Sequence, residues 1–115
     1  FRGGRDVRAR DYIRAWQELH RHRARWAEAV AGYDAVILPT APNLPPKIDR
    51  LASDPDYYVT ENLLTLRNTR VGNLMGISAL TLPTGVPSTG LMLLGAAMGE
   101  ERLLRLGAAA EAALA

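Results

Sequence analysis

A run of four apolar residues, Ala35-Val36-Ile37-Leu38, ends at Pro39 and is the clearest strand signal in the chain. Proline has no amide hydrogen, so it interrupts a ladder of backbone hydrogen bonds. A short apolar run without polar alternation is typical of a strand that is buried on both faces. The sequence therefore predicts an α/β fold in which this strand lies in a sheet flanked by helices.

Hydrophobic periodicity and turn residues divide the rest of the chain. Helices are predicted over residues 6–31, 60–75 and 99–114, with Thr60 as the cap of the second helix and Gly72 and Gly76 near its end. Strands are predicted over 78–83 and 91–95, and because their connection is too short for a helical crossover they should pair antiparallel. The proline-rich segment 39–56 is predicted to be a loop. The expected architecture is a mixed sheet of about three strands.

The positive charge of the chain is concentrated near its start. Residues 1–26 carry eight arginines and three acids, a balance of +5, whereas residues 27–115 carry six bases and nine acids, a balance of −3. A basic helix can dock on an acidic partner or on nucleic acid, so a stand-alone binding module that uses helix 6–31 is one alternative. No nucleic-acid-binding motif accompanies the arginines, so nucleic acid is not an expected partner.

Composition excludes several classes of site. The chain contains no cysteine, which removes disulfides, cysteine nucleophiles and thiolate metal sites. No apolar run reaches the roughly 20 residues that span a bilayer, and no export signal precedes the first helix. His20 and His22 point about 200° apart on a helix and cannot share one metal ion. We therefore expect a cytoplasmic protein without a membrane contact, a metal or a cofactor.

The residues that carry catalysis in hydrolases are not arranged for it here. The three serines, Ser53, Ser78 and Ser88, lie in no nucleophile elbow, and Lys47 is the only lysine. We therefore predict that none of these 115 residues is catalytic and that the segment alone is inactive.

Four segments in order resemble the C-terminal third of the amidase signature family. Residues 33–42 (YDAVILPTAP) resemble its D-x-(hydrophobic)-x-x-P-T-x-P segment, and residues 69–76 (TRVGNLMG) resemble T-x-x-x-N-x-x-G. Residues 78–85 (SALTLPTG) and 89–95 (TGLMLLG), with 101–104 (ERLL), resemble the two segments that follow. The helix around 10–15 (RDYIRA) is similar to the helix that precedes the P-T strand in that family.

The resemblance implies part of a mixed-sheet amidase core, with the cleft lined by loop 39–60 and helix 61–75. It implies hydrolysis of an amide carbon–nitrogen bond by a Ser–cis-Ser–Lys triad on a Gly/Ser-rich segment. That segment and its lysine are absent here, so the catalytic residues are expected upstream. Residues 87–90 (PSTG) also replace the family's usual G-L-P-V-G. The candidates for lining the substrate cleft are Thr40, Asn73 and Pro83, of which the Asn73 amide is expected to bond loop backbone.

The same resemblance sets the expected domain organisation and partners. Residues 1–115 are predicted to be the C-terminal segment of one amidase domain, without an internal boundary. An initial Phe1 in place of methionine agrees with that expectation. The expected partners are the N-terminal remainder of the amidase, on the same or a separate chain, and a small-molecule amide, and a homo-oligomer is left open. A degenerate, non-catalytic amidase-like scaffold is a further alternative. We expect the isolated segment to be marginally stable or self-associating, because its strand faces lack covering.

Overall fold

The structure is a computed structural model that describes residues 2–114. Phe1 and Ala115, the two ends of the predicted 1–115 segment, lie outside the described residues. The chain divides into two compact units, with the boundary after Gly32. Each unit is described by itself below. Within residues 2–114, no helix is both long and apolar enough to cross a membrane.

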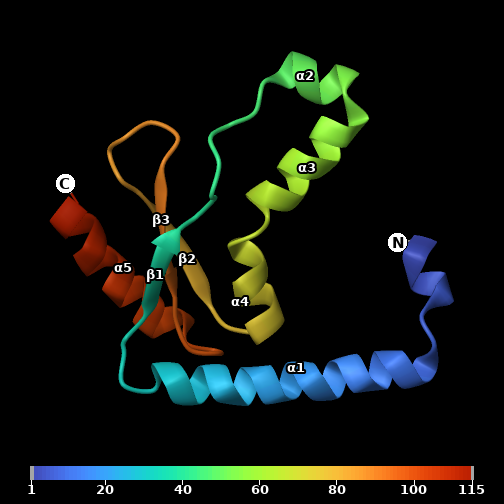
Figure 1. Cartoon of the computed structure of the whole chain (residues 1–115). Coiled ribbons are helices and arrows are strands. Elements are labelled where there is room, and N and C mark those ends of the chain that lie inside the picture. The colour runs from blue at the N-terminus through green and yellow to red at the C-terminus, as the bar shows by residue number, and fades with distance from the viewer. Residues whose placement is uncertain (1, 115) are drawn as a thin grey trace. The chain divides into compact units, whose positions relative to one another are not determined.

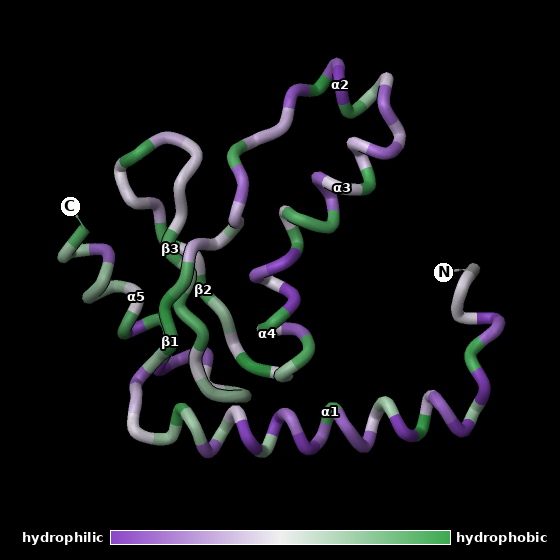
Figure 2. Tube along the Cα trace, viewed as in Figure 1, coloured by the Kyte–Doolittle hydropathy of each residue, from purple (hydrophilic) through white to green (hydrophobic). Residues whose placement is uncertain are grey.

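The first unit holds a 3₁₀-helix, Arg2–Asp6, and one long helix, α1 (Ala9–Val30), so the helix predicted over 6–31 is confirmed (Figure 1). Figure 2 shows that hydrophilic and hydrophobic residues alternate along α1. Its least exposed side chains follow one stripe: Leu19, Arg23, Trp26 and Val30. The Arg23 guanidinium lies 5.8 Å from the centre of the Trp16 ring, which places a cation over an aromatic face. No residue of α1 is buried.

The second unit is built on a three-stranded sheet of β1 (Val36–Pro39), β2 (Ala79–Pro83) and β3 (Gly90–Leu94), in the order β1-β3-β2. The predicted antiparallel pairing of the second and third strands is confirmed. The α/β class is confirmed as well. We expected a mixed sheet, but both pairings made within residues 2–114 are antiparallel, because β1 also runs opposite to β3.

Helices cover both faces of this sheet. On one face, Leu103 of α5 (Glu100–Leu114) packs with Leu82 and Leu93 to form the main core cluster. On the other face, Gly72 of α4 (Thr69–Met75) faces the side chains of Leu94 and Ala79. The most deeply buried side chains, Met92 and Leu94, belong to β3. The central strand is therefore sandwiched, which agrees with the apolar run Leu91-Met92-Leu93-Leu94 along it.

The strand β1 does not have the two buried faces that its sequence predicts. Val36 and Leu38 are half-buried, but Ile37 is 63% exposed. Ile37 is exposed because β1 is an edge strand of this sheet. The helix on that face, α5, packs against β2 and β3. Two-sided burial of this strand is therefore not seen within residues 2–114, which agrees with the expectation that strand faces of this segment lack covering.

The segment between β1 and β2 differs most from the predictions. The predicted loop 39–56 contains the short helix α2 (Ile48–Ser53) and the start of α3 (Pro55–Thr65). Asp54, not Thr60, caps α3, because its Oδ1 accepts a hydrogen bond of 3.0 Å from the amide of Tyr57. Pro55 follows at the first helical position, where a missing amide hydrogen costs nothing.

The helix predicted over 60–75 is in fact two helices. A turn at residues 66–68 separates α3 from α4. Gly72 does not interrupt α4 but lies buried within it, facing the side chains of Leu94 and Ala79. Gly76 ends α4 as expected, with a left-handed φ of 68° that favours glycine.

Candidate functional site

Thr40 follows β1 directly and is fixed by backbone and side chain. Its amide donates to the carbonyl of Gly90 at 2.9 Å, which extends the β1–β3 ladder by one residue. Its hydroxyl Oγ1 donates to Oγ1 of Thr81 on β2, at 3.2 Å. Thr40 is half-buried and Thr81 is exposed. The two threonines, 41 residues apart in the sequence, thus form a hydroxyl pair at one end of the sheet.

The hydroxyl pair depends on the absence of a side chain at Gly90 in the strand between them. A Cβ placed there would lie 2.9 Å from Thr40 Oγ1 and 3.1 Å from Thr81 Cγ2, closer than carbon normally approaches either atom. Glycine therefore lets both threonine side chains reach across β3, which is the close-approach role of glycine within a strand.

The structure brings together two of the three predicted cleft residues. Pro83 is the last residue of β2 and is paired with Gly90, so it lies at the same end of the sheet as Thr40. Asn73 is exposed on α4, next to Gly72, which packs on Ala79 and Leu94 at the opposite end of the strands. Asn73 is therefore not part of the group that contains Thr40.

A different asparagine holds the loop backbone at this site. The side-chain amide of Asn68 donates to the carbonyl of Pro39 at 2.7 Å, joining the start of α4 to the end of β1. Asn68 stands at the cap position of α4 but makes no capping bond with its side chain. The sequence signal was an asparagine in a turn before a helix, which usually predicts a cap. Its partner, 29 residues earlier, could not be read from the sequence.

A second polar cluster fastens the loop beyond Thr40 to α3. The side-chain nitrogen of Asn43, Nδ2, donates to Oε2 of Glu61 at 2.7 Å and to Oγ1 of Thr65 at 3.0 Å. Asn43 and Glu61 are both half-buried. A hydrogen bond to a carboxylate is stronger than one between neutral groups, so Glu61 is the main anchor of this loop. Sequence reasoning did not identify either residue.

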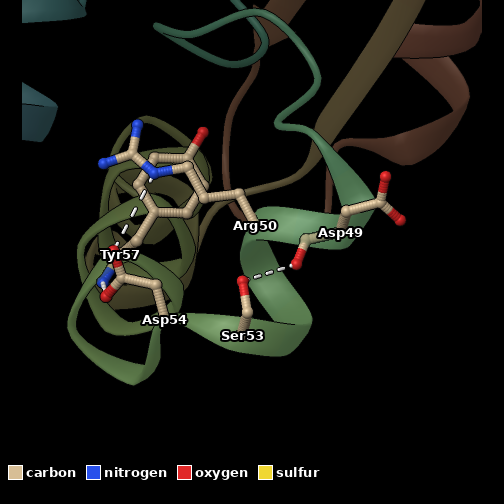
Figure 3. Close-up of polar contacts among 5 residues, drawn as sticks. All are labelled: Asp49, Arg50, Ser53, Asp54 and Tyr57. Carbon is tan, nitrogen blue, oxygen red and sulfur yellow. Dashed lines mark hydrogen bonds and ion pairs between the residues drawn. The ribbon is translucent and has the colours of Figure 1, made fainter.

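The far end of the loop is organised around Arg50, as Figure 3 shows. The guanidinium lies over the Tyr57 ring, 3.9 Å from its centre, and its Nε is 3.8 Å from Oδ2 of Asp54. Ser53 Oγ donates to the backbone carbonyl of Asp49 at 2.8 Å. The two contacts of Arg50 hold α2 against the first turn of α3, and the Ser53 bond lies within α2. Because Arg50 and Asp54 are largely exposed, their ion pair adds little stability.

A cavity of about 310 Å³ lies at the opposite end of the sheet from Thr40. It is lined by the following residues: Ser78, Ala79, Leu80, Glu100, Leu103 and Leu104. The hydroxyl of Ser78 is buried, and among residues 2–114 it has no hydrogen-bond partner. The cavity is separate from the group around Thr40, which belongs to the other end of the strands.

No serine of the second unit is paired with a base in the part of the chain that the structure describes. Ser53 bonds to backbone, Ser78 is unpartnered, and Ser88 lies in the exposed loop between β2 and β3 with a φ of 62°. The described residues also hold no group of three side chains suited to bind a metal ion. What the geometry shows around Thr40 and Asn43 is a set of hydroxyl and amide groups fixed by hydrogen bonds to neighbouring elements.

Comparison with known proteins identifies the family to which these residues belong. The family model described as Amidase matches residues 2–104. The chain belongs to the amidase family. The match includes the arginine-rich helix, so the comparisons give no support to the alternative of a separate basic binding module. No solved structure matches the chain significantly.

Curated amidase-family relatives are similar along most of this chain. It is 31% identical to 2-amino-5-chloromuconic acid deaminase of Comamonas testosteroni, covering 96% of this chain and 25% of the relative. It is 32% identical to a glutamyl-tRNA(Gln) amidotransferase subunit of Rhodococcus erythropolis, covering 95% of this chain and 20% of the relative. The chain thus spans a fifth to a quarter of the length of these relatives.

Proposed function

We propose that this chain is the C-terminal, cleft-lining part of a longer amidase that hydrolyses an amide carbon–nitrogen bond. The observation that carries the proposal is the family match over residues 2–104. The small share of each relative that the chain covers supports its being one part of a larger domain. The single family match over residues 2–104 supports the absence of an internal domain boundary. The expected partners are the N-terminal remainder of that domain and a small-molecule amide, in the cytoplasm and without a cofactor.

The reaction then belongs to residues upstream of this chain. A serine hydroxyl attacks the amide carbonyl, while a second serine and a lysine carry its proton to the leaving nitrogen. The carbon–nitrogen bond breaks, the amine leaves, and an acyl-enzyme remains. Water attacks that ester and releases the acid, returning the proton to the serine. None of these steps uses a residue of the present chain as nucleophile or base.

The role of this chain is to shape the space where the acyl or leaving group lies. Thr40 and Pro83 stand at one end of the sheet, and loop 40–47 is fixed there by Asn68 and Asn43. Asn73, on the exposed side of α4, is a candidate for a separate contact with the substrate. Fixed walls lower the entropic cost of orienting a substrate, so their contribution is to positioning.

The test is an assay of ammonia release from simple amides by the full-length protein and by residues 1–115 alone. We expect the full-length protein to hydrolyse amides and the 115-residue chain to be inactive. A full-length protein that hydrolyses none of a broad amide panel would refute the proposal and favour a non-catalytic scaffold. Co-expression of the chain with the upstream remainder, which should restore activity, tests whether the two parts form one domain.

A further inference from the structure

The hydroxyl pair of Thr40 and Thr81 has an unused hydrogen-bond donor. Each hydroxyl supplies one donor and two acceptor lone pairs. The bond between Thr40 Oγ1 and Thr81 Oγ1 consumes one of the two donors, whichever residue donates. Within the described residues, this is the only hydrogen bond that either hydroxyl makes. One O–H group of the pair therefore remains available to an acceptor from outside.

The surroundings hold this pair in place and leave it accessible. Thr81 is paired with Met92, and Leu38 is paired with the same residue, so these three side chains share one face of the sheet. Thr40 follows Leu38 by two residues and lies on that face as well. Met92 lies between the two outer strands on that face and is buried, whereas Thr81 is exposed. The pair thus lies next to a buried apolar side chain, and within residues 2–114 Thr81 is open to solvent.

Two further features make the pair preorganised. Gly90 leaves the space between the threonines without a side chain, and the Asn68 amide holds the carbonyl of Pro39 just before Thr40. A donor that is already oriented loses little freedom when it binds, so it favours a ligand more than a mobile surface hydroxyl does.

We propose that Thr81, together with Thr40, determines specificity by binding an acceptor oxygen that the substrate carries outside the amide group being cleaved. This inference rests on the proposed amidase function. The ligand chemistry is that of a carboxylate or a second carbonyl group, because the pair offers a neutral O–H donor. Thr81 would act in substrate binding and not in the bond-breaking step.

The kinetic test uses the full-length protein with three amides of similar size: succinamate, succinamide and pentanamide. Thr81→Val removes the hydroxyl but keeps the shape, and Thr81→Ser keeps the hydroxyl. We expect Thr81→Val to lower kcat/KM about tenfold for succinamate and succinamide through KM, with pentanamide changed less than about twofold. Thr81→Ser should retain most of the wild-type value. Tyr33→Phe, which removes the hydroxyl of an exposed residue outside the cleft-lining segments 39–75, is the control.

An equal loss on all three amides would show that Thr81 only supports the fold and would overturn the proposal, as would no loss on any of them. Succinamate carries a carboxylate and succinamide a second amide carbonyl. A larger effect of Thr81→Val on succinamate would show that the bound oxygen belongs to a carboxylate. Equal effects on the two amides would show that the site accepts a carboxylate and a carbonyl oxygen alike. Both results support the proposal.

A binding measurement separates this inference from the proposed function. Succinate, which cannot be hydrolysed, is titrated into the full-length protein and followed by saturation-transfer NMR. We expect Thr81→Val to weaken its binding about tenfold and Tyr33→Phe to leave it unchanged. Absence of succinate binding by the wild-type protein, or equal binding by Thr81→Val, would overturn the inference. If no amide is hydrolysed but succinate binds through Thr81, the proposed function fails and the binding site stands.

Discussion

Replacing Gly107 with alanine tests how tightly α5 packs on the sheet. Gly107 is buried, and a Cβ at this position would lie 2.2 Å from Cδ2 of Leu80 and 3.8 Å from Cδ2 of Leu82. The first distance is far inside normal carbon contact, so the Leu80 side chain must leave its rotamer or the helix must move outward.

The expected change in the free energy of unfolding combines two opposing terms. Overpacking a core costs about 1–3 kcal/mol. Replacing glycine with alanine inside a helix stabilises by about 1 kcal/mol. Because the atom in conflict is the end of a flexible side chain, we expect a packing cost of no more than about 2 kcal/mol and hence a net destabilisation of about 1 kcal/mol.

The assay is urea unfolding at low protein concentration, followed by circular dichroism, for a double-mutant cycle of Gly107→Ala and Leu80→Ala. In the Leu80→Ala background the conflict disappears, so Gly107→Ala should stabilise by about 1 kcal/mol. Ala109→Gly, at an exposed site of α5, measures the helix term alone in the same helix. If Gly107→Ala stabilises the wild-type background by as much as the Ala109→Gly control destabilises it, the packing argument is wrong.

Four further predictions concern the loop, the core, a cap and the exposed strand face. Asn68→Ala should speed hydrogen exchange at the Thr40 amide and destabilise by about 1 kcal/mol, since it removes the bond to Pro39; unchanged exchange would show that the bond does not fix the loop. Leu93→Ala, in the core cluster, should destabilise by about 2–5 kcal/mol in urea unfolding; a cost below that of a surface substitution would contradict the assigned core. Asp54→Ala should cost about 1 kcal/mol through loss of the α3 cap, while Asp54→Asn should retain most of the stability. The 115-residue chain should self-associate in light scattering, because Ile37 and the edge of β1 are open; a monodisperse monomer with a cooperative melt would count against this.

Local signals predicted the C-terminal half of the fold well. The connection between residues 83 and 90 is too short for a crossover, so an antiparallel pair of strands follows from chain geometry alone. Gly76 ends its helix because a left-handed residue is needed there and glycine supplies it without strain. The apolar residues of α5 repeat with the helical period, and that period also places Leu103 toward the sheet.

The predictions failed where packing, not local pattern, decides the structure. The helix α2 has six residues, too few for a hydrophobic period to be visible among the prolines around it. The Asp54-Pro55 pair did carry a local signal for the start of α3, but Thr60 was preferred because an acid follows it. The exposure of Ile37 depends on which elements lie beside β1, which no property of four apolar residues can specify.

The site was accessible to sequence reasoning only in part. Thr40 and Pro83 are predicted because they belong to segments that resemble the amidase family and end strands there, and both stay candidates for the substrate cleft. The contribution of Thr81 follows from register: β1 and β2 both pair with β3, so residues on the two outer strands meet across it. That order could not be derived from a single sequence, because the hydrophobic runs permit other arrangements of the three strands.

The strand order also has a consequence for how the chain is made. The central strand, β3, is the last of the three to be synthesised, and residues 40–89 lie between β1 and β3. During translation β1 leaves the ribosome first, and it has no partner in this sheet until that whole stretch has followed. The β1–β3 pairing therefore has a large sequence separation, which slows folding, whereas β2 and β3 can close as a hairpin at once. The hydroxyl pair, which joins the two outer strands, is complete only after the slower of these two steps.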